Sequence, residues 1–110
     1  MADIGLAELE DLFSRMREEL DPDEPLNWGY VFIAPDKRRL RPVADELLAT
    51  GYLEGGLFRT DDGRTHFLRM ERIERHSPES LHARNAELEA LAKCHGVDYD
   101  GMEAGPAESA

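Results

Sequence analysis

The 110-residue chain contains a single cysteine, Cys94, and so cannot form a disulfide within itself. Disulfides are concentrated in exported proteins, so a lone cysteine favours a reducing compartment, and we expect a cytoplasmic protein. The chain also lacks any apolar run that approaches the roughly 20 residues needed to cross a bilayer. No membrane-spanning segment is therefore predicted.

Positive charge is scarce: 13 Lys and Arg stand against 24 Asp and Glu, which gives a net charge of −11. The excess of acid lies at the two ends. Residues 1–24 hold nine acids and two bases (−7), residues 96–110 hold four acids and no base (−4), and the segment between them sums to zero. Such a chain repels nucleic acid and anionic membranes and attracts basic polypeptide, so we expect a protein partner with a basic segment.

The sequence has none of the short motifs that carry a defined catalytic mechanism: no Gly-rich phosphate loop, no HExxH, no GxSxG and no CxxC. Its histidines do not form a zinc signature either. His76 and His82 are six residues apart across a helix start, and no Cys/His pair has the short ligand spacing of a tetrahedral site. We therefore predict no catalytic residue, no metal and no cofactor.

The length fits one domain, which we place at residues 1–103, followed by a disordered tail at residues 104–110. Apolar residues at three- and four-residue steps predict a helix over Ile4–Leu20, which Pro22 ends. Aromatic and β-branched residues bounded by prolines predict a central strand over Leu26–Ala34. These two elements form the N-terminal third of the chain.

Asp36 is a candidate cap for the next helix, whose apolar stripe extends to a stop at Gly51. Pro42 interrupts that pattern. Either the regular helix begins near Pro42, or a 3₁₀-like first turn precedes it, and we favour the later start. Two strands follow, over residues 52–60 and 64–73, joined by a turn at Asp62-Gly63.

Ser77 and Pro78 predict the start of a last helix, and Gly96 its end. A short edge strand over Val97–Met102 follows, with Asp98 and Asp100 on its solvent-exposed face. After the leading helix the order is thus strand, helix, strand, strand, helix, strand. This order predicts an α+β ferredoxin-like split βαβ sandwich: an antiparallel four-stranded sheet with two helices on one face and an extra N-terminal helix.

The aromatic residues Trp28, Tyr30 and Phe32 share one face of the central strand, as in sheets that stack RNA bases. The acidic ends argue against that use. We expect this face to pack under the N-terminal helix or against a second subunit in a homodimer, and Val31 and Ile33 to lie under the other two helices.

Three stretches carry a resemblance to a known family: "LDPDEPLNWGYVF", the Gly51-Tyr52 pair, and "AELEALAKCHGVDYDGM". Together they resemble the regulator of ribonuclease activity B family, small acidic bacterial proteins that bind ribonuclease E and inhibit its RNA cleavage. Met102 stands where the family pattern has tryptophan, and the long acidic tail of many members is nearly missing. The resemblance implies a non-enzymatic regulator whose partner surface is an Arg-rich segment of the ribonuclease.

Carboxylates near a basic segment speed encounter and pair well with arginine. The candidate partner-binding residues therefore come from the acidic N-terminal helix and the last strand: Glu8, Asp11, Glu18, Glu19, Asp98, Tyr99, Asp100 and Glu103.

One basic patch offers an alternative function, a small-ligand or nucleotide site that binds an anion. It comprises Lys37, Arg38, Arg39 and Arg41. The same charges would also suit a solvated loop that pairs with the acidic N-terminal helix. A third alternative is a structural module that only dimerises.

Overall fold

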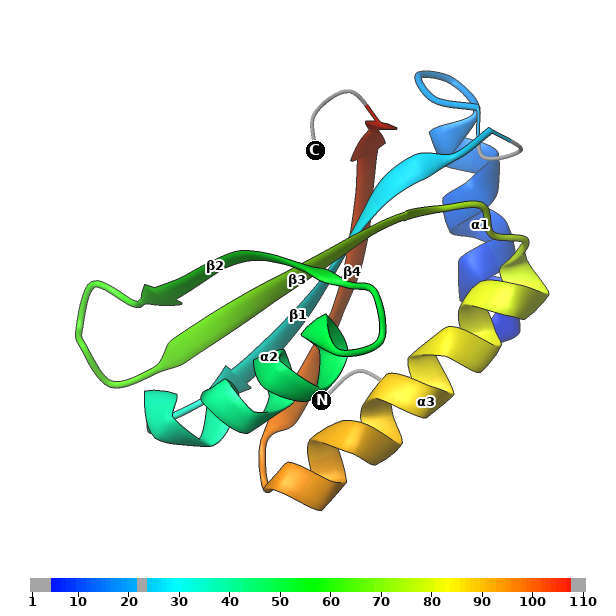
Figure 1. Ribbon diagram of the computed structural model, residues 1–110. Coiled ribbons are helices and arrows are strands. Elements are labelled where there is room, and N and C mark those ends of the chain that lie inside the picture. The colour runs from blue at the N-terminus through cyan, green and yellow to red at the C-terminus, as the bar shows by residue number, and fades with distance from the viewer. Residues whose placement is uncertain (1–4, 22–23, 108–110) are drawn as a thin grey trace.

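The structure, a computed structural model, describes residues 5–21 and 24–107 (Figure 1). Its elements, in chain order, are α1 (Leu6–Met16), β1 (Leu26–Ala34), the 3₁₀ turn η1 (Lys37–Arg39), α2 (Leu40–Leu48), β2 (Leu53–Arg59), β3 (His66–Glu74), α3 (Pro78–His95) and β4 (Asp98–Pro106). The strands form one sheet in the order β2-β3-β1-β4, and every neighbouring pair is antiparallel. The predicted α+β ferredoxin-like fold with an extra N-terminal helix is confirmed.

The core lies on one face of β1, where the side chains of Trp28, Tyr30 and Phe32 are fully buried. Phe13 of α1 stacks on Trp28 with ring centroids 6.1 Å apart. Figure 1 shows α2 and α3 lying over the same side of the sheet. All three helices therefore contribute to a single core on the aromatic face.

The prediction that Val31 and Ile33 lie under two of the helices is wrong, because both side chains are on the opposite face and only partly buried. The two right-handed crossovers of a split βαβ fold place α2 and α3 on one face of the sheet. That face is the one with the larger side chains, since burying aromatic residues removes more apolar area from water. With the aromatic face covered, neither an RNA-stacking platform nor a dimer interface can form there.

The N-terminal helix is shorter than predicted. α1 ends at Met16, four residues before the predicted end at Leu20, and turns continue the chain, with the Leu20 amide donating to the Met16 carbonyl at 2.7 Å. Acidic residues at a helix C-terminus oppose the helix dipole, which favours this early stop before Glu18 and Glu19.

The structure combines the two alternatives for the second helix: a 3₁₀ turn comes first, and the regular helix begins near Pro42, at Leu40. Asp36 caps η1 by accepting a hydrogen bond from the Arg38 amide at 2.9 Å, and α2 follows at once from Leu40. Pro42 is tolerated because it lies in the first turn of α2, where its missing N–H has no partner to lose.

The C-terminal helix begins and ends as predicted. The Ser77 hydroxyl accepts a hydrogen bond from the Ser80 amide at 3.1 Å, Pro78 is the first helical residue, and Gly96 is left-handed at φ +69°. The last strand is longer than predicted, because β4 continues to Pro106 beside Leu26. Residues 104–106 therefore belong to the sheet and not to a tail, and residues 108–110 lie outside the described part of the chain.

Over residues 5–21 and 24–107, no helix is both long and apolar enough to pass through a bilayer.

The left-handed backbone at Gly96 generates the first prediction. Replacing Gly96 with alanine should lower the free energy of unfolding by about 1–2 kcal/mol, because a Cβ is strained at positive φ. The matched control is Gly105→Ala, where no positive φ is found and no atom lies within 4 Å of a new Cβ. Urea unfolding of both variants measures the difference; equal stabilities would contradict the prediction.

Candidate protein-interaction surface

The acidic residues of the N-terminal helix face solvent. Leu9 and Phe13 turn one side of α1 into the core, which leaves Glu8 and Asp11 exposed. Asp11 pairs with Arg15 at 3.2 Å, but both side chains are about 70 % exposed, so the pair contributes about 0.5 kcal/mol or less. The carboxylate of Glu8 accepts a hydrogen bond from the Gly5 amide at 3.4 Å.

Glu18 and Glu19 lie just beyond α1, where residues 17–21 line an open hollow of about 550 Å³. Both side chains are exposed, and no salt bridge forms at either of them within the described residues. These two carboxylates are free to meet a cation from outside.

The predicted residues of the last strand separate into surface and core. Asp98 and Asp100 are exposed, whereas Tyr99 is only 1 % exposed and its hydroxyl donates a hydrogen bond to Asn85 Oδ1 on α3 at 2.6 Å. Burial raises the pKa of Tyr99. Its side chain thus belongs to the core and cannot meet a partner, while the two aspartates on either side can.

β4 is an edge strand with an irregularity beside these aspartates. Val31 pairs with Gly101 and Phe32 pairs with Tyr99, so Asp100 is an extra residue in a β-bulge, and Gly101 has a φ of +125°. A bulge increases the local twist and re-aims side chains at a sheet edge. The outer backbone of β4 is left without a neighbouring strand in the described sheet.

Glu103 is turned toward the protein's own arginine. Arg69 of β3 crosses over Gly29 on the open face of the sheet, forms an ion pair with Glu103 on the far side, and pairs with Glu71 at 2.7 Å. Gly29 leaves room for this crossing, because a Cβ there would collide with the guanidinium. Of the carboxylates predicted on β4, Asp98 and Asp100 remain open to solvent without such a partner.

The predicted basic patch is divided. Arg38 pairs with Asp36 at 2.9 Å, and this hydrogen bond lowers the pKa of the Asp36 carboxyl to about 2. Arg41 pairs with Glu54 at 2.5 Å and with Asp45 at 3.2 Å. The patch therefore pairs with nearby acids rather than with the acidic N-terminal helix. Lys37 and Arg39 stay exposed, and neither has a salt bridge among the described residues.

The sequence did not predict a buried polar cluster at the junction of β1, β3 and α3. The Tyr30 hydroxyl donates to Glu74 at 2.5 Å and lies 3.0 Å from His76 Nε2, while His76 Nδ1 lies 2.9 Å from the Ser80 hydroxyl. Arg84 of α3 donates to the same Glu74 carboxylate at 2.9 Å. A carboxylate, an imidazole and a hydroxyl in contact resemble catalytic machinery, so their protonation states matter.

Two groups of this cluster, Glu74 and Tyr30, have shifted pKa values, and neither is suited to proton transfer near neutral pH. Burial alone would raise the pKa of Glu74, but hydrogen bonds from His76 and Tyr30 and the charge of Arg84 outweigh it and lower the pKa to about 2. Burial, the hydrogen bond to Glu74 and its charge raise the pKa of Tyr30. An efficient general acid or base has a pKa near the operating pH. The cluster is instead suited to fixing α3 on the sheet.

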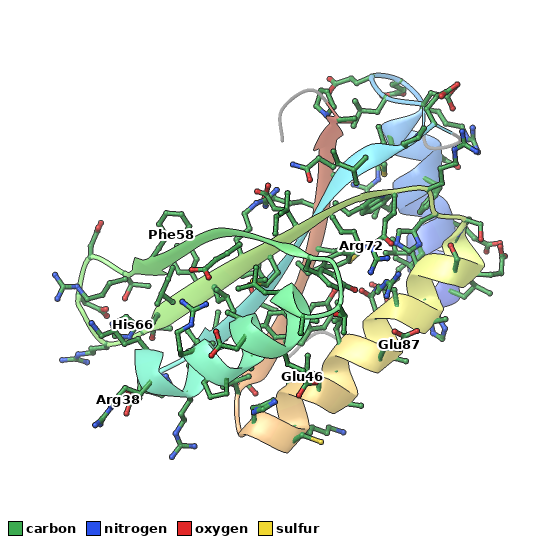
Figure 2. All side chains as sticks on the ribbon, in the orientation of Figure 1. Arg38, Glu46, Phe58, His66, Arg72 and Glu87 are labelled. Atoms are coloured by element: carbon green, nitrogen blue, oxygen red, sulfur yellow. The ribbon has the colours of Figure 1, made fainter. Side chains whose placement is uncertain are left out.

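A hollow of about 260 Å³ lies between α2 and α3 next to this cluster. The guanidiniums of Arg72 and Arg84 lie over the Tyr52 ring at 5.1 and 5.7 Å from its centroid. Figure 2 shows Glu46 on α2 and Glu87 on α3 beside the gap between the helices. The two arginines share Glu74 as a partner, and Arg84 also pairs with Glu87. Two acids, Glu46 and Glu87, line the hollow together with the two arginines, so its lining has no excess of positive charge.

In the part of the chain that the structure describes, no three His, Cys, Asp or Glu side chains come together in a way that could hold a metal ion. The prediction that the protein needs no metal or cofactor stays a prediction.

The fold and the exposed charged groups define the class of protein: a ferredoxin-like α+β domain whose acidic side chains are presented to solvent. The family model described as regulator of ribonuclease activity B matches residues 6–104, nearly the whole chain. The chain belongs to this family, which confirms the resemblance noted in its sequence. The family consists of regulators of ribonuclease activity and is not a catalytic one. A search of the curated proteins found no match.

The Glu74 cluster generates a prediction about acid stability. The folded-state pKa of about 2 lies below the ordinary value of 4.5, so the ionised carboxylate stabilises the fold above pH 4.5, and this stabilisation is lost as the pH falls toward 2. Glu74→Gln should cost about 2 kcal/mol at pH 7 and flatten the loss of stability between pH 4.5 and 2.

Urea unfolding at several pH values from 7 to 3 measures this effect. The control is Glu87→Gln, which removes a 67 % exposed carboxylate from a long 3.4 Å pair with Arg84 and should leave the pH profile unchanged. An acid profile of Glu74→Gln that parallels the wild type would contradict the role of Glu74.

Proposed function

We propose that this protein regulates an E-type ribonuclease in the cytoplasm by binding an arginine-rich segment of the enzyme, without catalysis of its own. Family membership supports a role in regulating ribonuclease activity. The observation that carries the binding mechanism is the exposure of Glu18, Glu19, Asp98 and Asp100, which have no salt bridge within the described residues. Unpaired exposed carboxylates need not break an existing contact before they accept an arginine.

The free edge of β4 supports a specific mode of binding. An extended peptide can add to a sheet edge, with main-chain hydrogen bonds supplying affinity and alternate side chains supplying specificity. Asp98 and Asp100 are two residues apart along such an edge, so arginines at alternate positions of an extended segment would lie close to them. The acidic surface would steer the encounter, and the strand edge would hold the segment in register.

The proposed binding should weaken with salt, because exposed charges are screened beyond about 10 Å at 0.1 M ionic strength. Replacing both Asp98 and Asp100 with asparagine should weaken binding of an arginine-rich peptide about fivefold to tenfold at low salt and reduce the salt dependence. Glu18→Gln with Glu19→Gln should act in the same direction. Titration calorimetry or fluorescence anisotropy at several salt concentrations measures both effects.

The matched control removes two charges elsewhere, through Asp61→Asn with Glu79→Gln. These exposed acids lie on the β2–β3 turn and in the first turn of α3. If the control weakens binding as much as the β4 variant, only net charge matters and the edge is not the site. If the wild type does not bind the peptide at low salt, the mechanism is wrong.

A further inference from the structure

The end of the molecule that carries the β2–β3 turn has a hollow outside the acidic surface. It has a volume of about 260 Å³ and lies where η1, β2 and β3 meet. Its lining residues come from three elements: Lys37, Leu57, Phe58, Arg59 and His66. Figure 2 shows Phe58, His66 and Arg38 at this end of the sheet. Folding thus brings together two cations, Lys37 and Arg59, that are 22 residues apart in sequence.

The positive charges of this hollow are not matched by partners. Neither Lys37 nor Arg59 forms a salt bridge with any described residue, and both are exposed. Most nearby acids are already engaged. Asp36 is paired with Arg38, and Asp62 accepts hydrogen bonds from the Thr60 hydroxyl at 2.6 Å and from the Arg64 amide at 3.0 Å. Asp61, exposed on the turn, is the remaining carboxylate of the β2–β3 loop.

His66 supplies a third nitrogen group whose orientation is fixed. Its Nδ1 lies 3.2 Å from the Pro35 carbonyl oxygen. A carbonyl oxygen can only accept, so Nδ1 carries the proton in this bond, and the contact fixes the ring against Pro35.

We propose that this hollow binds a small phosphate-bearing molecule, with Lys37 and Arg59 contacting the phosphate and the His66 ring forming part of the lining. Convergent cations on a concave surface suit a compact anion. Leu57 and Phe58 give the hollow an apolar wall for the rest of the ligand. The volume lies just below the roughly 300–1,000 Å³ of pockets for drug-sized ligands, so it suits a phosphate with a small organic group.

The charge of the whole protein decides between a small phosphate and a nucleic acid. A long polyanion would approach the acidic ends, where net charges of −7 and −4 are concentrated, and would be repelled. A single phosphate in the hollow avoids them. β4 lies three strand spacings from β2, about 14 Å at about 4.8 Å each, which exceeds the Debye length at physiological salt.

The site is tested by NMR titration of the intact protein with inorganic phosphate, with adenosine monophosphate and with a single-stranded RNA oligomer. Phosphate and the mononucleotide should shift the resonances of Lys37, Arg59 and His66. If the mononucleotide binds more tightly than free phosphate, the ligand of the hollow is a phosphate monoester. If the two bind with equal affinity, the ligand is phosphate itself. No shift at these residues with either compound would overturn the proposal.

Two variants that each remove one positive charge, with their controls, complete the test. Lys37→Gln and Arg59→Gln should each weaken phosphate binding about tenfold. Lys93→Gln and Arg75→Gln remove cations that are also exposed but lie outside the hollow, and they should leave binding unchanged. Equal weakening in the controls would overturn the site. An RNA oligomer that binds much more tightly than the mononucleotide would overturn the assignment to a small molecule. None of these measurements requires a ribonuclease, so the outcome is independent of the proposed regulatory function.

Discussion

The burial of Trp28, Tyr30 and Phe32 beneath all three helices is the constraint on which the rest of the structure depends. These side chains are fully buried on one face of the central strand. Because the crossovers place α2 and α3 on that face, no helix covers the opposite face. There Arg69 forms ion pairs with Glu71 and, across the strands, with Glu103. The exposed edge of β4 follows from the same topology, since the order β2-β3-β1-β4 ends there.

The same burial explains the polar cluster between α3 and the sheet. Burial of the Tyr30 ring also places its hydroxyl in the protein interior. A buried hydroxyl destabilises the fold unless it is hydrogen-bonded. Glu74 accepts that bond, and His76 and Arg84 offset the cost of burying the carboxylate. A cluster with a catalytic composition is thus a consequence of placing a tyrosine in the core. The same contacts join α3 to the sheet, since Arg84 of α3 pairs with Glu74 of β3.

Elements that local chemistry defines could be predicted from the sequence. Prolines at both ends and an aromatic, β-branched interior were enough to place β1 at Leu26–Ala34, and Ser77, Pro78 and Gly96 were enough to place α3. Local patterns could not decide which face of β1 is covered, because both faces contain apolar residues. The length of β4 depends on the pairing of Pro106 with Leu26, 80 residues earlier. Its local composition therefore predicted a strand that was too short.

The candidate surfaces divide in the same way. Exposure of Asp98 and Asp100 follows from alternation within one strand, and exposure of Glu18 and Glu19 follows from their place off the apolar stripe of the predicted first helix. The pairing of Glu103 with Arg69 joins residues 34 positions apart, and a run of cations from Lys37 to Arg41 gives no sign that two of its members pair with nearby acids. Short-range patterns therefore predicted charge and exposure, whereas the identity of each charge's partner required the fold.

The positions of the charges bear on how a basic segment would approach. Asp98 lies opposite Ile33 at one end of β1, while α1 leads into the other end, so the two acidic groups are separated by roughly the length of a nine-residue strand, about 30 Å. A compact cation could meet only one group at a time. An extended, arginine-rich segment could engage both acidic groups. Once it binds one group, its remaining arginines are held at a high local concentration near the other, which would raise the affinity. For the partner proposed above, this separation favours a disordered basic segment over a folded basic domain, because only an extended chain would follow both the edge of β4 and the end of α1.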